Sequence, residues 1–347
     1  MVSVLRKLIA HLALLRSDDA LVAASGGAPR SVRGMVLDPR VQFIEQKARE
    51  NPFDWEKVTP AHVRARTDAL SATFGGGKVG GVRRQRVYVT GRSHSVPCRL
   101  YLPRVRDNNA AMLVYYHYGG GVIGTLEDCE RLCSLIARVS GAPVLSVEYR
   151  LAPEYKFPAG FEDALAAFHW GVENAARFGA AVGKVAVGGD SMGGNFAAAI
   201  AQQTRGGRGP KPVLQLLIYP GLDLVSDTAS MHEFADAFPL TEDLLAFFLK
   251  HYLPDGVDPS DPRVSPGRTQ DLSRLPPALI YGAGFDILLD QGEAYADRLT
   301  QAGVKTKYVR FDTLPHGFVA FPSMTPAAEA AIRRIAADAA PALKGKL

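Results

Sequence analysis

Short apolar runs alternate with helical stretches along most of the chain beyond residue 85, and this alternation restricts the fold more than any other feature. Several runs are apolar throughout, as expected of parallel strands covered on both faces. Repeated strand–helix alternation predicts a mostly parallel, eight-stranded sheet flanked by helices, an α/β fold. The expected strands are Arg86–Thr90, Cys98–Leu102, Met112–Tyr116, Pro143–Tyr149, Val185–Gly188, Val213–Tyr219, Ala278–Tyr281 and Lys307–Phe311.

Helical patterns fall between the later strands but not between the first two. Because those first two strands follow each other without room for a helix, an antiparallel hairpin is expected at that edge of the sheet. The expected helices are Glu127–Val139, Phe161–Ala176, Asn195–Gln203 and Gly292–Gln301.

Two segments stand outside the alternation. Residues 1–75 are expected to be helical and irregular, and they end at a glycine-rich break. About sixty residues precede the strand that begins near Ala278, and one crossover helix needs far fewer. We therefore expect a main domain of residues 76–221 and 263–347. Residues 1–75 and the insertion 222–262, with its helical pattern Thr241–Tyr252, are expected to form a helical cap.

The N-terminus carries an apolar stripe at helical spacing. It predicts an amphipathic helix that packs on the body or contacts a lipid surface. A signal peptide is disfavoured because Arg16, Asp18 and Asp19 stand where a small-residue cleavage site belongs. The stripe consists of Leu5, Leu8, Ile9, Leu12 and Leu15.

Composition excludes several classes of protein. With 47% apolar and 22% charged residues, the chain is globular rather than disordered, and no apolar run is long enough to span a membrane. The first 106 residues carry 19 Lys and Arg against 8 Asp and Glu. These charges are scattered, which favours a solvated face over a nucleic-acid site. Three cysteines without a C-x-x-C pair argue against a disulfide framework or a zinc site and favour the cytoplasm.

The segment Gly189-Asp-Ser-Met-Gly193 follows an apolar strand and opens a helix of small residues. This is G-x-S-x-G in the strand–turn–helix context of a nucleophile elbow. The glycines are needed sterically, and the helix N-terminus favours negative charge developing near Ser191. The alternative is a glycine-rich turn with a capping Ser or Asp. The context favours Ser191 as a nucleophile.

A serine nucleophile needs a base that a third group orients, in the chain order Ser, acid, His. Three histidines follow Ser191: His232, His251 and His316. We favour His316, which follows the last expected strand. For the acid, Asp286 lies just past the preceding strand and Asp290 lies one helical turn later. Either could cap a helix, and we favour Asp286.

The loop His117-Tyr-Gly-Gly-Gly121 follows the strand Met112–Tyr116 and matches the HGGG-type oxyanion loop of lipases and esterases. Two of its amides, with the Met192 amide, are expected to stabilise a tetrahedral oxyanion. A phosphate-binding turn is disfavoured because the loop has no G-K-[ST] Walker ending. His117 is expected to anchor the loop rather than to act as a base.

Together these motifs resemble the hormone-sensitive-lipase family of bacterial carboxylesterases, over roughly residues 85–335. The resemblance implies an α/β-hydrolase fold with a cap and cofactor-free, metal-free hydrolysis of short- to medium-chain esters. Its implied roles are nucleophile for Ser191, acid for Asp286 and base for His316, with oxyanion donors Gly119, Gly120 and Met192. The motifs are His117–Gly121, Tyr149–Glu154, Gly188–Gly194, Tyr219-Pro220, Asp261–Pro266, Asp286 and His316–Phe318.

The chain departs from the family pattern at a few positions. Tyr118 stands where the first loop glycine is usual, and Gly121 stands where an aromatic residue is usual, which removes a ring from the expected pocket floor. Met192 replaces the usual alanine. The cap aromatics are equally consistent with packing and with pocket lining. They are Phe43, Phe53, Trp55, Phe234, Phe238, Phe247 and Phe248.

The expected function is therefore a serine carboxylesterase that acts on small-molecule esters. The alternatives are a lipase acting at lipid surfaces, which the N-terminal helix would serve, a noncatalytic ligand receptor on the same fold, and an amidase. No nucleic-acid partner is expected, membrane contact is disfavoured, and a homodimer is left open. Acyl length, alcohol preference and stereoselectivity depend on the cap.

Overall fold

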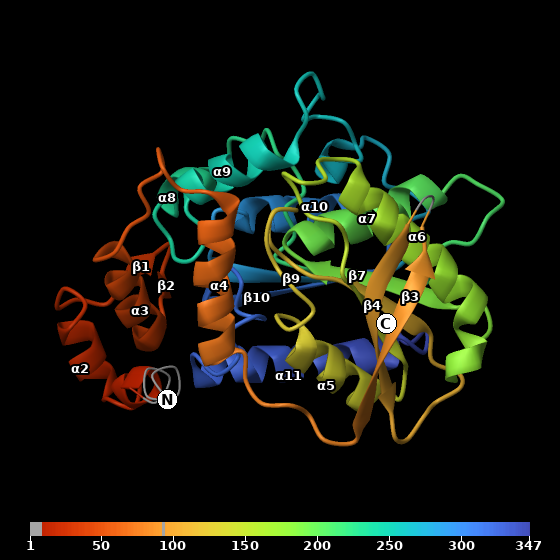
Figure 1. The fold of residues 1–347 in the computed structure, drawn as a ribbon, viewed down its shortest axis with the longest axis horizontal. Coiled ribbons are helices and arrows are strands. Elements are labelled where there is room, and N and C mark those ends of the chain that lie inside the picture. The colour runs from red at the N-terminus through yellow and green to blue at the C-terminus, as the bar shows by residue number, and fades with distance from the viewer. Residues whose placement is uncertain (1–8, 92–93) are drawn as a thin grey trace.

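The computed structural model describes residues 9–91 and 94–347, and an eight-stranded sheet forms its centre (Figure 1). The strand order is β10-β9-β8-β7-β5-β6-β4-β3. The strands from β10 to β6 are parallel, whereas β4 is antiparallel to both β6 and β3. The predicted sheet and its edge hairpin are confirmed. The strands are β3 (Val82–Thr90), β4 (Ser95–Pro103), β5 (Met112–Tyr116), β6 (Val144–Val147), β7 (Val185–Asp190), β8 (Gln215–Ile218), β9 (Ala278–Phe285) and β10 (Thr306–Pro315).

Helices cover both faces of this sheet, which explains the unbroken apolar strands. In Figure 1, α5 and α11 lie on one face and α6, α7 and α10 on the other. A separate buried apolar cluster fills each side. The bounds are α5 (Glu130–Ser140), α6 (Ala159–Asn174), α7 (Met192–Thr204), α10 (Leu289–Gln301) and α11 (Pro326–Ala342), with short 3₁₀ turns η1 (Ala176–Phe178) and η2 (Pro266–Arg268).

The helix α11 has no counterpart among the expected helices. Its sequence is rich in alanine, so it lacks the stripe of large apolar side chains that marks an amphipathic helix. Local signals nevertheless define its start: the Thr325 side chain accepts hydrogen bonds from the amides of Ala327 and Ala328, and Pro326 occupies the first turn. Ile332 and Ile335 are fully buried against the sheet.

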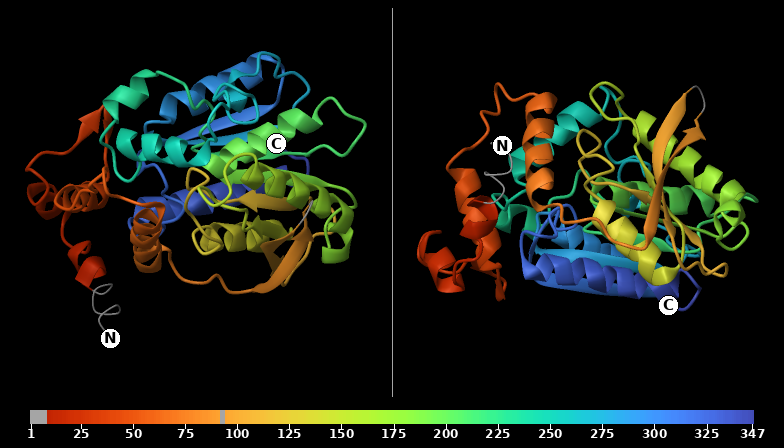
Figure 2. Two further views of the ribbon diagram at one scale, coloured as in Figure 1. Left: turned by 45° about the horizontal axis from the view of Figure 1, so that its top comes forward. Right: turned by 60° about the horizontal axis from the view of Figure 1, so that its bottom comes forward.

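The N-terminal segment and the insertion after β8 meet beside one end of the sheet (Figures 1 and 2). Ion pairs join them: Asp236 contacts Arg30 at 2.6 Å and Arg49 at 2.5 Å. Arg33 contacts Glu233, and it also reaches Asp290 on α10 at 2.6 Å. The elements are α2 (Asp18–Ala23), β1 (Ser31–Val32), β2 (Met35–Val36), α3 (Pro39–Arg49), α4 (Pro60–Phe74), α8 (Ala229–Glu233) and α9 (Glu242–Tyr252).

Of the two alternatives for the N-terminal stripe, packing on the body is wrong. Leu5 and Leu8 lie outside the described residues. Ile9, Leu12 and Leu15 belong to the stripe but are 57%, 53% and 78% exposed. Leu14, outside the stripe, is buried instead, so this segment packs on the body through a different face. Within the described ranges, no helix is both long and apolar enough to cross a membrane.

Replacing Ile335 by alanine tests the packing of α11. Deleting a fully buried isoleucine side chain is expected to lower the free energy of unfolding by about 2–5 kcal/mol, because transfer and cavity costs add. Urea unfolding followed by circular dichroism measures the loss. Replacing the exposed Arg333 of the same helix by alanine is the control, with an expected change below about 0.5 kcal/mol. Equal losses in both variants would contradict this packing.

Candidate active site

Ser191 lies at a sharp turn between β7 and α7. Its backbone has φ 54° and ψ −116°, a conformation that L-residues adopt only when surrounding structure holds them there. Two backbone hydrogen bonds hold the turn: the Ser191 amide donates to the Ile218 carbonyl at 2.9 Å, and the Gly221 amide donates to the Ser191 carbonyl at 3.2 Å. A Cβ at Gly193 would overlap the carbonyl oxygen of Tyr116, so only glycine fits there.

The structure brings Ser191, His316 and Asp286 together at the carboxyl ends of β7, β10 and β9. Nε2 of His316 lies 2.9 Å from Oγ of Ser191, and Nδ1 lies 2.7 Å from Oδ2 of Asp286. The three residues are 8%, 4% and 1% exposed, respectively. The Leu288 amide donates to the second carboxylate oxygen of Asp286 at 2.9 Å. With Nδ1–H donating to Asp286, Nε2 is free to accept the serine proton.

The other candidates occupy different surroundings. Asp290 pairs with Arg33 and accepts a hydrogen bond from the Ser230 amide at 2.8 Å. His232 is exposed and contacts Asp227, and His251 bonds the Phe247 carbonyl through Nδ1. Among the histidines that follow Ser191, His316 is the one that contacts it.

The oxyanion loop presents unpaired amides beside the serine. Gly119 and Gly120 have φ of 118° and 60°, and their N–H groups have no acceptor within the described part of the chain. Gly119 and Ser191 line the same pocket. Met192 is the first residue of α7, so its N–H lacks an intrahelical acceptor. Unpaired backbone N–H groups of this kind are the donors that an oxyanion hole uses.

Contacts of neighbouring side chains fix the conformation of this loop. The His117 ring stacks on Tyr149 at 4.2 Å between centroids, and its Nδ1 bonds the Tyr118 carbonyl at 2.7 Å. Burial lowers the pKa of His117 to about 4, so the ring is neutral and serves as an anchor. Arg64 of α4 donates to the Val122 carbonyl at 2.9 Å and forms a bidentate pair with Glu154.

The two departures in this loop have a structural explanation. At Gly121, where an aromatic residue is usual, the ring of Tyr252 from α9 occupies the space that a Cβ would need. The Phe248 ring lies against Gly120 in the same way. The insertion thus places two rings against the loop, and one of them, Phe248, lines the pocket, which corrects the expectation that the pocket loses a ring. Tyr118 is buried and lines the pocket beside Ser191.

A buried carboxyl group, that of Asp190, directly precedes Ser191 in the chain. Asp190 accepts hydrogen bonds from the hydroxyls of Tyr115 at 2.8 Å and Tyr219 at 3.0 Å. The Tyr219 ring also lies 4.7 Å from the His316 ring, between centroids. Burial raises the pKa of Asp190 to about 7, although both hydroxyl donors and the His316 charge oppose the rise. The sequence analysis did not single out Asp190. The available signal was its place between the first glycine and the serine of G-x-S-x-G.

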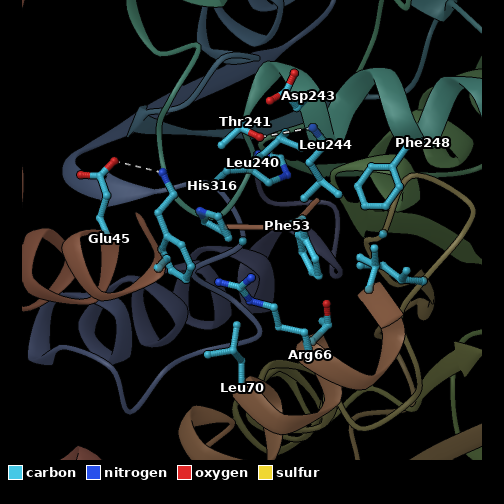
Figure 3. A pocket seen from close by; sticks show the side chains of 18 of the residues that line it. Glu45, Phe53, Arg66, Leu70, Leu240, Thr241, Asp243, Leu244, Phe248 and His316 are labelled. Carbon is cyan, nitrogen blue, oxygen red and sulfur yellow. Dashed lines mark hydrogen bonds between the residues drawn. The ribbon is translucent and has the colours of Figure 1, made fainter. Parts of the chain in front are cut away.

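A pocket of about 260 Å³ opens onto Ser191 and His316 (Figure 3). Its walls come from α3, α4, the oxyanion loop and the insertion. Of the cap aromatics, Phe53, Trp55, Phe238 and Phe248 line it, whereas Phe43, Phe234 and Phe247 pack elsewhere. Most of the wall is apolar, with charged groups at a few positions. In the described ranges, no three His, Cys, Asp or Glu side chains gather as a metal site.

Comparison with known proteins gives the same fold, and the similar proteins are named as ester hydrolases. A family model described as alpha/beta hydrolase fold matches residues 113–320. The carboxylic ester hydrolase LipN of Mycobacterium tuberculosis is 40% identical over 307 residues, which is 85% of this chain and 80% of that protein. The ethyl acetate hydrolase of Pseudomonas putida is 38% identical, covering 65% of this chain and 72% of the relative.

A similar solved structure is also that of an esterase. A hyperthermophilic esterase from the archaeon Pyrobaculum calidifontis superimposes with a TM-score of 0.81 at 37% identity, covering 88% of this chain and 98% of that one. The chain therefore belongs to the α/β-hydrolase fold family. The resemblance to hormone-sensitive-lipase-type carboxylesterases and the prediction of a carboxylic ester hydrolase are confirmed.

Replacing Asp190 by asparagine tests the buried carboxyl. A folded-state pKa near 7, above the ordinary 3.8, gives stability that is present at low pH and lost as pH rises through 7. The free energy of unfolding of the wild type should therefore decrease from pH 5 to pH 8 by an amount that is missing in Asp190→Asn. Urea titrations at both pH values measure it.

The matched control for this experiment is Asp255→Asn, an exposed carboxyl with no ion-pair partner among the described residues. It should keep the wild-type difference between pH 5 and pH 8. If Asp190→Asn also keeps that difference unchanged, Asp190 does not bind its proton as described.

Proposed function

We propose that the protein is a serine carboxylesterase in which Ser191 is the nucleophile, His316 the base and Asp286 the acid. The observation that carries the proposal is the continuous hydrogen-bonded chain from Oγ of Ser191 through the His316 ring to Asp286, at 2.9 and 2.7 Å. Free amides of the oxyanion loop beside the same serine support it. The named relatives are ester hydrolases, which agrees with this chemistry.

The proposed reaction has two halves. Oγ of Ser191 attacks the ester carbonyl carbon while Nε2 of His316 takes its proton, and Asp286 stabilises the imidazolium. The amides of Gly119, Gly120 and Met192 hold the oxyanion. The intermediate collapses, the C–O bond breaks, and His316 returns the proton to the leaving alcohol. Water then attacks the acyl-enzyme with His316 again as base, releasing the carboxylic acid and Ser191.

We further propose that residues 1–75 and 222–262 form a cap that sets substrate size over a domain of residues 76–221 and 263–347. Both segments contribute pocket walls, for example Phe53 and Phe248, and ion pairs join them. A volume of about 260 Å³ lies just below the usual range for small-molecule sites, roughly 300–1,000 Å³. This favours short- to medium-chain acyl groups.

A cytoplasmic location is also our proposal. Its support is that Cys98, Cys129 and Cys133 are all buried free thiols, which suits a reducing compartment.

Replacing Ser191 by alanine tests the nucleophile. Without Oγ no acyl-enzyme forms, so kcat for p-nitrophenyl butyrate should fall at least about a thousandfold. A fluorophosphonate probe should label the wild type and leave the variant unlabelled, with mass spectrometry as the readout. An alanine variant that keeps wild-type turnover would overturn the proposal.

Two carboxyl groups near the site provide a matched control. Asp286→Asn should lose activity by several orders of magnitude because His316 takes the wrong tautomer. Asp290→Asn, four residues along the chain, should stay within a few fold because Asp290 pairs with Arg33 and not with the imidazole.

Acyl chain length tests the size of the pocket. Activity across p-nitrophenyl esters from acetate to palmitate should peak at short to medium chains and be low at C16, because the cavity cannot bury a long chain. Rates on emulsified long-chain triglycerides should be lower still. A maximum at C16, or activation at the emulsion surface, would favour the lipase alternative.

A further inference from the structure

The pocket wall carries few charges, and most of them neutralise one another. Glu45 pairs with Arg30 and with Arg49, at 3.3 Å for the latter. Asp236 pairs with the same two arginines at 2.6 and 2.5 Å. The Phe238 amide donates to the same Glu45 oxygen, Oε1, at 3.2 Å. This cluster therefore presents no unbalanced charge to a substrate.

Arg66 differs from the other charged groups of the wall. It lies on the face of α4 that lines the pocket, together with Val63, Thr67 and Leu70. Its guanidinium donates to the Asn51 carbonyl at 2.9 Å and lies 4.5 Å from the Phe53 ring centroid. Within the described ranges, no carboxylate pairs with it. Its remaining N–H donors, arranged as a planar fork, have no protein acceptor there.

The surroundings of Arg66 confirm that its charge is uncompensated. Burial lowers the pKa of Arg66, and no acid raises it. On the same helix, by contrast, the hydrogen bond to Glu154 raises the pKa of Arg64. A cation held against an apolar wall costs free energy unless an anion meets it. Arg66 remains charged at neutral pH because an arginine side chain does not deprotonate in proteins.

Among the described residues of the wall, Asp243 is the other charged group without an ion-pair partner, but it is negative and differently placed. Asp243 is exposed in the first turn of α9, where it stabilises the helix N-terminus and is screened by solvent. Figure 3 shows Arg66 extending from α4 into the pocket, on the side of Phe53 and Leu70. Asp243 lies on the opposite side and points away from it.

We propose that Arg66 is a specificity-determining residue that selects esters carrying a free carboxylate, which its guanidinium fork binds while Ser191 attacks the ester bond. A guanidinium and a carboxylate match in geometry and form strong, charge-assisted hydrogen bonds. The substrate class is therefore half-esters of dicarboxylic acids or esters of acidic alcohols. This inference rests on the proposed esterase function and names the substrates of that same site.

Two pairs of probes separate the acyl side from the alcohol side. Monoethyl adipate and ethyl hexanoate differ by a carboxylate at the end of the acyl chain. Acetoxybenzoate and acetoxybenzamide, both para-substituted, differ by a carboxylate on the leaving group. Within each pair, hydrolysis of the neutral ester shows that the variant is folded and that its catalytic residues work. Hydrolysis of the acidic ester additionally depends on recognition of the carboxylate. Chromatographic detection of the products gives kcat and KM for all four compounds.

In at least one pair, Arg66→Gln should lower kcat/KM of the acidic ester at least about tenfold, mainly through KM, because a charge-assisted bond is lost. The neutral ester should stay within twofold, and Arg66→Lys should recover part of the loss. Arg83→Gln removes the same charge from an exposed position on β3 and should leave both probes unchanged.

The outcomes separate this inference from the esterase function. If the wild type turns over the neutral esters but Arg66→Gln leaves the acidic-to-neutral ratio unchanged in both pairs, carboxylate recognition is wrong and the esterase proposal stands. If Arg66→Gln lowers acidic and neutral esters equally, Arg66 only supports α4, and the inference is also wrong. If the wild type hydrolyses none of the four esters and no fluorophosphonate labels Ser191, the esterase proposal itself is wrong.

Discussion

The close approach of α7 to the end of β5 is the contact on which the site depends. A side chain at Gly193 would overlap the Tyr116 carbonyl, and one at Gly189 would overlap the backbone of Gly193. Because both residues are glycines and lack a Cβ, α7 can begin directly after β7, with only Ser191 between them at φ 54°. Backbone strain of this kind persists only where surrounding structure over-determines it. The buried strands β5, β7 and β8 and the buried first turns of α7 supply that surrounding structure.

The parallel sheet then assembles the rest of the site. Because β7, β8, β9 and β10 are consecutive parallel neighbours, the residues that follow them share one edge of the sheet. Asp286 directly follows β9, and His316 directly follows β10. Tyr219, which follows β8, fills the space between them and Asp190, contacting both Asp190 and the His316 ring. The insertion and the N-terminal segment complete the pocket above this edge.

Local patterns were enough to predict the strands, the elbow and the residues Ser191, Asp286 and His316 that the structure brings together, because each depends on a few neighbouring positions. Features set by distant packing were not predicted. The tyrosine partners of Asp190 lie in β5 and directly after β8, and only the strand order makes these two strands the neighbours of β7. Arg66 gave no local signal because the pocket-facing side of α4 depends on where the N-terminal segment docks. The alanine-rich α11 lacked the large apolar side chains that mark a buried helix.

The most direct measurement is a crystal structure of the protein inhibited by an ethyl p-nitrophenyl alkylphosphonate, which loses p-nitrophenolate and keeps its ethyl ester oxygen; its tetrahedral phosphorus mimics the proposed intermediate. The account predicts a covalent bond from phosphorus to Oγ of Ser191. The phosphoryl oxygen should lie about 2.7–3.1 Å from the amide nitrogens of Gly119, Gly120 and Met192, with Nε2 of His316 near the remaining ester oxygen. Phosphonylation of a different residue, or a phosphoryl oxygen turned away from all three amides, would contradict it.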